Sequence, residues 1–129
     1  MELIDSSELP APAGHYSQAV KAGGLVFVSG ILPALSEVSP GAPFADQCAS
    51  VFTQCEKVLR AAGCGFDDVV QCTAYIADVA HWPAFNAAYA RAFGAHKPAR
   101  AVVPVAALHH GFLVEVQLVA EVPKAGLLD

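Results

Sequence analysis

Two residues of opposite charge stand in the most apolar part of the chain. Arg100 and Glu115 belong to KPARAVVPVAALHHGFLVEVQLVAEV, the segment from Lys97 to Val122. A charged group in apolar surroundings costs free energy unless a partner compensates it. Arginine can grip a carboxylate through two parallel hydrogen bonds, and glutamate can accept a proton from water. Either the two charges serve a chemical site, or each meets a structural partner at the edge of a sheet.

Composition narrows the class of protein. The chain has 129 residues, which predicts one domain over residues 1–129. Its hydrophobic content of 55% is high and its charged content of 15% is low, so we expect self-association. With 12 acidic against 7 basic residues and a net charge of -5, nucleic acids and anionic membranes are disfavoured as partners. A single local basic site could still hold a small anion.

No export signal, membrane span or metal site is expected. The first nine residues are acidic, and no apolar run reaches the ~18 residues of a membrane span, so we expect a cytoplasmic protein. The four cysteines form no CxxC pair and are interpreted as small buried hydrophobic residues: Cys48, Cys55, Cys64 and Cys72. The five histidines do not lie at spacings that would make a zinc site with them.

The pattern of apolar residues predicts an α+β chain in the order β-β-α-β-α-β-β. The expected elements are a hairpin closed by Gly23-Gly24, a helix from Phe44 to a stop at Gly63, a strand Val69–Ile76, a second helix from near Asp78 to Gly94, and two strands, Ala101–Leu108 and Phe112–Val122, joined by a tight turn at His109–Gly111. Helical stripes run through Val51, Cys55, Val58, Leu59 and Ala62, and through Trp82, Phe85, Tyr89 and Phe93.

The sheet of four or five strands should be covered on both faces. Two helices can cover only one face, and VVPVAAL and FLVEVQLVA lack a consistently polar side. We therefore expect a closed homo-oligomer with its sheets packed inward.

The relation between Arg100 and Glu115 depends on the last turn. A two- or four-residue loop would put Glu115 opposite Ala106 on the same face as Arg100, about 20 Å away along the strands. A three-residue loop would put the two side chains on opposite faces. In the first case the two residues could share one site only if they came from different subunits, and this inference is conditional on the register.

Six short blocks follow one another along the chain: GHYSQAV, LVFVSG, QCASVFTQCEKVLRAAG, FNAAYARAFG, KPARAVV and FLVEVQLVA. Together they resemble the reactive intermediate deaminases, enamine/imine deaminases also labelled endoribonuclease L-PSP, and the similarity runs from about Pro12 to Val122. The resemblance implies a chorismate-mutase-like α+β fold, with a mixed sheet and two helices on one face. It also implies a homotrimer with three sites in the clefts between subunits.

The resemblance implies hydrolysis of reactive 2-imino acids, such as 2-aminoacrylate-like compounds, to 2-oxo acids and ammonia without a cofactor. Arg100 of KPAR matches the residue that holds the substrate carboxylate, and Glu115 of VEV matches the acid that orients the attacking water. Four further positions match the pocket: Tyr16, Ser29, Gly30 and Asn86. Each of these four is also an ordinary structural residue in its element.

The chain departs from the family pattern around the expected pocket. His15, Ile31, Ala101 and Val102 stand where the family usually has proline, glutamine, serine and often cysteine, and LHHG replaces the commoner LPKG. These departures leave the substrate open, from a larger or more apolar 2-imino acid to an aminomuconate-like compound. His109 and His110 are interpreted as polar turn residues.

Two other classes of function compete with the deaminase. A non-catalytic trimer could use Arg100 to bind a small carboxylate in a regulatory or chaperone-like role. A ribonuclease would need a basic surface for phosphates, which the net charge of -5 disfavours.

Overall fold

A six-stranded mixed sheet forms the centre of the computed structural model, which describes residues 1–123. Its order is β1-β2-β3-β6-β4-β5, with β4 and β5 parallel and the other pairs antiparallel. The strands are β1 (Glu2–Ile4), β2 (Ala19–Ala22), β3 (Leu25–Ile31), β4 (Val69–Ile76), β5 (Ala99–Pro104) and β6 (Val114–Glu121). The expected α+β class with a mixed sheet is confirmed.

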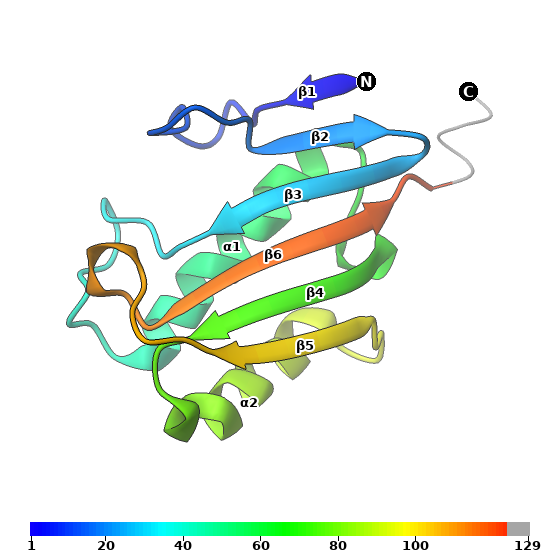
Figure 1. The fold of residues 1–129 in the computed structure, drawn as a ribbon. Helices are drawn as coiled ribbons and strands as arrows, with labels where there is room; N and C mark the ends of the chain where they lie inside the picture. Colours follow the sequence, from blue (N-terminus) through cyan, green and yellow to red (C-terminus); the bar gives the residue numbers. More distant parts are fainter. Residues whose placement is uncertain (124–129) are drawn as a thin grey trace.

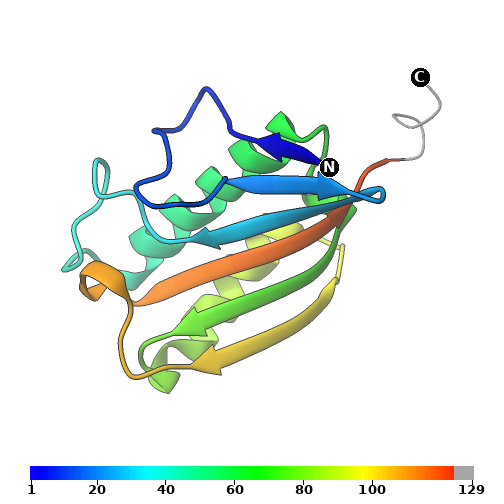
Figure 2. The same cartoon turned by 45° about the horizontal axis from the view of Figure 1, so that its top comes forward.

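Two helices, α1 (Phe44–Ala61) and α2 (Trp82–Phe93), cover one face of this sheet. Figures 1 and 2 show them side by side behind the strands, with the other face of the sheet open. The core lies between these two layers, where the inward residues of β3, β4 and β6 meet the helical stripes. The prediction that both helices lie on one face is confirmed.

The sequence pattern predicted the positions of both helices correctly. All five residues of the expected α1 stripe are buried, and Gly63, at φ 81°, follows the helix in the left-handed conformation that ends it. The second helix begins at Trp82, after a short 3-10 turn capped by Asp78, and ends before Gly94 at φ 62°. Phe85, Tyr89 and Phe93 of the second expected stripe are buried, whereas Trp82 is 42% exposed.

The predicted hairpin of the last two strands is wrong. β5 ends at Pro104, which cannot donate to a ladder, and β4 lies between β5 and β6. The chain between β5 and β6 leaves the sheet and includes a 3-10 turn at His109–Gly111 before β6 returns to the centre. The two pairing partners of β6, β3 and β4, are therefore both distant from it in sequence, and no local turn signal indicates such pairing.

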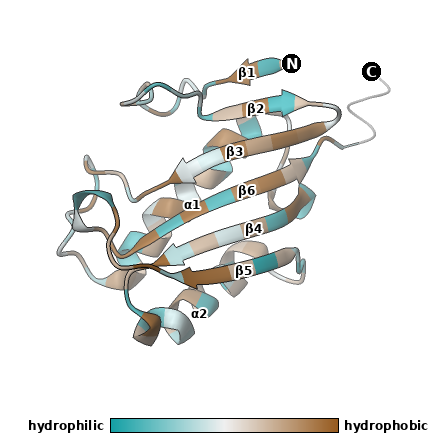
Figure 3. Ribbon diagram, in the orientation of Figure 1, coloured by the Kyte–Doolittle hydropathy of each residue, from teal (hydrophilic) through white to brown (hydrophobic). Residues whose placement is uncertain are grey.

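The open face of the sheet is mixed rather than apolar throughout. Outward positions of β6 carry Glu115, Gln117 and Val119, while Phe27 and Val103 on other strands are exposed apolar residues. Figure 3 shows β5 hydrophobic toward its C-terminal end and hydrophilic nearer its start. The expectation of two apolar faces is thus correct only in part.

Three further predictions concern the chain as a whole. β1 was not expected, since three residues are too few to show an alternating pattern, and it brings the sheet to six strands. Within the described residues, none of the helices combines the length and the apolar character needed to cross a membrane. The domain prediction extends to residue 129, and residues 124–129 lie outside the described part of the chain.

One buried amide ties three segments together and gives a test of the fold. Gln47 of α1 is fully buried; its Nε2 donates to the carbonyls of Pro40 at 3.1 Å and Ala42 at 3.0 Å, and its Oε1 accepts from the Leu113 amide at 2.9 Å. Gln47→Leu leaves these backbone groups without partners and should lower the free energy of unfolding by about 2–4 kcal/mol. Urea unfolding measures it, with Gln71→Leu on exposed β4 surface as the control. Equal midpoints for the two variants would contradict this role.

Candidate active site

Arg100 projects from β5 toward α2 and, within the part of the chain that the structure describes, has no acidic partner. Its Nη1 donates to the Asn86 side-chain oxygen at 2.9 Å, and its guanidinium carbon lies 4.7 Å from the ring centre of Tyr89 and 5.8 Å from that of Trp82. Among residues 1–123, no carboxylate lies within 4.0 Å of it. One neutral amide and two aromatic faces therefore hold the guanidinium while its charge stays available to an anion.

Glu115 lies on the open face of the sheet against Gly30. A Cβ atom placed on Gly30 would come within 2.6 Å of the Glu115 carboxylate oxygen, so any larger residue would displace that carboxylate. Burial raises the pKa of the Glu115 carboxyl, and nearby His109 acts in the opposite direction. A half-buried carboxylate of raised pKa accepts a proton more readily than an exposed glutamate does.

The two charges point to opposite faces of the sheet. Arg100 is the register partner of Cys72 on β4, and Glu115 is the register partner of Tyr75 on the same strand. Cys72 and Tyr75 are three positions apart, and an odd separation along a strand reverses the face. The register that placed Glu115 opposite Ala106 on the face of Arg100 is therefore wrong. Within one chain, the sheet itself separates the two side chains.

The remaining expected site residues divide between the two charges. Asn86 contacts Arg100, and we call this pair the arginine half-site. Gly30 contacts Glu115, and Ser29 precedes Gly30 with its hydroxyl donating to the Ser17 carbonyl at 2.7 Å. Tyr16 is 53% exposed nearby and lines the same cavity as Ser29 and Gly30. We call Tyr16, Ser29, Gly30 and Glu115 the glutamate half-site.

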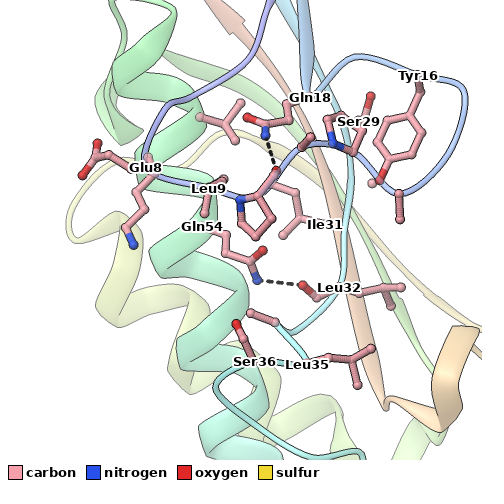
Figure 4. A pocket seen from close by; sticks show the side chains of 18 of the residues that line it. Glu8, Leu9, Tyr16, Gln18, Ser29, Ile31, Leu32, Leu35, Ser36 and Gln54 are labelled. Carbon is pink, nitrogen blue, oxygen red and sulfur yellow. Dashed lines mark hydrogen bonds between the residues drawn. The ribbon is translucent and has the colours of Figure 1, made fainter.

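A cavity of about 500 Å³ adjoins the glutamate half-site. It lies between the N-terminal segment, the end of β3 and α1, and Figure 4 shows Tyr16 and Ser29 at one side with Gln54 and Leu32 across from them. Its amides are occupied, because Gln18 donates to the Pro10 carbonyl and Gln54 to the Leu32 carbonyl. The cavity offers mainly an apolar lining to whatever enters it from the half-site.

The contacts of Arg100 with aromatic rings were not predicted from the sequence. Trp82 and Tyr89 were interpreted only as parts of a buried helical stripe. They stand at positions i and i+7 around Asn86 at i+4, so one side of α2 presents all three toward Arg100. An asparagine between two aromatic residues at helical spacing was the signal that could have identified this arrangement.

The four departures from the family pattern fall in different environments. Ile31 is buried in the core, and Val102 is half-buried against it on the helix-covered face. His15 and Ala101 are exposed. Ile31 nevertheless lines the cavity beside the glutamate half-site, so it and the exposed pair are the departures best placed to meet a ligand.

His109 and His110 form the turn that precedes β6. His110 has a φ of 62°, unusual for a residue other than glycine, and the two imidazole rings lie 3.9 Å apart. Their interpretation as exposed turn residues is confirmed by this geometry, and His109 additionally acts on the charge of Glu115.

The cysteines fit the interpretation as small buried hydrophobic residues. All four are free and buried, and burial raises the pKa of Cys48 and of Cys72 to about 12. Such thiols remain protonated at neutral pH and are poor nucleophiles. Within residues 1–123, no cluster of three or more histidine, cysteine or acidic side chains could hold a metal ion.

Comparison with known proteins identifies the family. A family model described as endoribonuclease L-PSP matches residues 6–122. The chain belongs to this family. Among its relatives, a RutC family protein of Pyrococcus horikoshii is 37% identical over 122 residues, covering 92% of this chain and 96% of the relative. The endoribonuclease L-PSP resemblance inferred from the six sequence blocks is thereby confirmed.

Two further members of the endoribonuclease L-PSP family bear on the site. A bovine (Bos taurus) protein named 2-iminobutanoate/2-iminopropanoate deaminase is 36% identical over 122 residues, covering 92% of this chain and 88% of its own. A crystal structure of E. coli TdcF with bound serine superposes with a TM-score of 0.86 at 27% identity, covering 94% of this chain and 98% of that one. The family therefore includes a named imine deaminase and a protein that binds a small amino acid.

The electrostatics of Glu115 can be tested by titration. Since its pKa is raised, the carboxyl keeps its proton to higher pH than an exposed glutamate and loses the capacity to accept one as pH falls through that value. His109→Asn removes the influence that lowers this pKa, so the midpoint should move to still higher pH. Carbon-detected NMR of the Glu115 side chain follows the titration.

The neighbouring histidine supplies the control for this titration. His110→Asn removes the adjacent imidazole at a position where asparagine tolerates the positive φ. It should leave the Glu115 midpoint in place. An unchanged midpoint in His109→Asn, or an equal shift in both variants, would remove His109 from the surroundings of Glu115.

Proposed function

We propose that the protein hydrolyses reactive enamine/imine intermediates, 2-imino acids, to 2-oxo acids and ammonia. The observation that carries the proposal is the division of the site: on one face lies an arginine without an acidic partner among residues 1–123, and on the other lies a carboxyl of raised pKa. A relative at 36% identity bears the name of an imine deaminase. The reaction needs one group to hold the substrate carboxylate and another to manage protons on water, and the two half-sites supply them.

Arg100 has the geometry to hold the substrate carboxylate. Tyr89 and Trp82 flank its guanidinium and Asn86 accepts one of its hydrogen bonds, which leaves other N–H groups for a carboxylate. Because the guanidinium is already held in place before the substrate binds, the Arg100 side chain loses less conformational entropy on binding. Asn86 acts in this proposal as a substrate-binding residue through its contact with Arg100.

Glu115 has the properties of the group that activates water. In the proposed reaction it accepts a proton from the water whose oxygen attacks the imine carbon, and that proton then passes to the nitrogen. This gives an adduct in which the carbon carries a hydroxyl and an amino group. The hydroxyl proton, the second proton of the water, also passes to the nitrogen as the carbon–nitrogen bond breaks; ammonia leaves, and the carbon keeps the new oxygen as the 2-oxo group. Tyr16, Ser29 and Gly30 line the approach to this carboxylate as substrate-binding residues. No metal or organic cofactor is required, because the imine carbon is already electrophilic.

A homotrimer completes the site in this proposal. Since the sheet separates Arg100 from Glu115 within one chain, the two half-sites can act on one substrate only across an interface between copies. Exposed Phe27 and Val103 on the open face favour such an association. The cytoplasmic location and the absence of nucleic acid partners stay predictions from composition.

Binding without turnover is the competing function. The serine-bound structure of E. coli TdcF supports a role as a receptor for small carboxylates, and a regulatory or chaperone-like trimer would need only the arginine half-site. Release of ammonia and a 2-oxo acid from an imine generated by an amino acid oxidase separates catalysis from binding.

Two substitutions test the separate roles. Glu115→Gln keeps the shape of the side chain but cannot accept a proton, so turnover should fall about 10²- to 10⁴-fold while a 2-oxo acid still binds. Arg100→Ala should instead weaken binding by about 2–5 kcal/mol, because the carboxylate loses its charged partner. Calorimetry with 2-oxobutanoate and a coupled turnover assay measure both quantities, with Arg91→Ala at an exposed position of α2 as control. Normal turnover in Glu115→Gln would exclude it from the reaction.

A further inference from the structure

The cavity beside Arg100 extends beyond the arginine half-site. It has a volume of about 470 Å³ and follows α2 from Asn86 to the loop that leads into β5. Asn86 and Gly94 both line it, and eight residues of helix correspond to about 12 Å. The cavity is therefore longer than one carboxylate bound at Arg100 requires.

The far end of this cavity is also basic. His96 and Lys97 line it there, so two of the chain's seven lysine and arginine residues open into one cavity of a protein with net charge -5. Within residues 1–123, neither aspartate nor glutamate lines the cavity, and no carboxylate lies within 4.0 Å of the Lys97 ammonium. Within the described residues, Arg100 and Lys97 thus both line the cavity without a carboxylate partner.

The loop that carries Lys97 is anchored. The His96 Nε2 atom lies 2.7 Å from the Val69 carbonyl oxygen, and because a carbonyl can only accept, Nε2 carries the hydrogen. This bond ties the loop to the start of β4. Ala90, Phe93 and Pro98 add apolar surface to the lining of the same cavity.

We propose that this cavity accepts a second anionic group, so that the preferred substrate is a 2-imino acid with a carboxylate on its side chain. This rests on the proposed function, in which Arg100 holds the first carboxylate. The methylene groups of the side chain then lie against the apolar part of the lining, and the second carboxylate meets Lys97. A monocarboxylic substrate leaves the lysine end to water and gains nothing from it.

Paired 2-oxo acids of equal length test the proposal. 2-Oxoglutarate and 2-oxopentanoate both have five carbons and differ by a terminal carboxylate in place of a methyl group. Calorimetry on the wild-type protein should show tighter binding of 2-oxoglutarate. Lys97→Met should reduce this preference roughly three- to tenfold, since an exposed lysine is partly screened by water. The preference of the wild-type protein should also shrink as salt is added.

Lys21→Met is the matched control, because Lys21 lies on β2 and three strands separate β2 from β5 in the sheet. It removes one positive charge and should leave the preference unchanged. Equal binding of the two acids by the wild-type protein, no binding of either, or the same preference in Lys97→Met and wild type would overturn the proposal. Selective binding of 2-oxoglutarate without turnover of any imine would instead contradict the proposed deaminase activity alone.

Discussion

The alternation of side chains across the sheet is the constraint on which the rest of the site depends. β4 lies between β5 and β6, and its register fixes Arg100 on the helix-covered face and Glu115 on the open face. No rotation of either side chain can bring the two through the sheet. The same register gives Arg100 its aromatic neighbours on α2 and places Glu115 beside the bulged end of β3 at Gly30. Each half-site is thus formed on its own face of the sheet, and the proposed reaction needs both.

Elements with a strong local period could be predicted from the sequence. The buried stripe of α1 follows from the 3.6-residue period of a helix. The ends of both helices follow from glycines, which adopt a positive φ readily. The pairing of β6 could not be predicted, because it is decided by contacts with β3 and β4 across most of the chain. The false hairpin followed from a local turn signal at His109–Gly111, where the structure has a turn but no strand pairing.

For the site, the sequence indicated which residues belong to it but not how they lie relative to one another. Arg100 and Glu115 stood out as charges in apolar strands, and their neighbours came from short sequence blocks. The face of the sheet to which each residue points depends on strand register. From the sequence, that register could be stated only as a function of the length of one loop. The support of Arg100 by Trp82 and Tyr89 was hidden because aromatic residues at helical spacing usually indicate core packing.

Complementation between copies tests most directly whether two chains complete each site. Arg100→Ala and Glu115→Gln should each be inactive alone, while subunits of both kinds assembled together should recover about one quarter of wild-type turnover, since random pairing joins an intact Arg100 to an intact Glu115 in roughly one site of four. If one chain held the whole site, the mixed assemblies would be no more active than the two parent variants. Turnover at the parental level in assemblies shown to contain both kinds of subunit would contradict a site completed between copies.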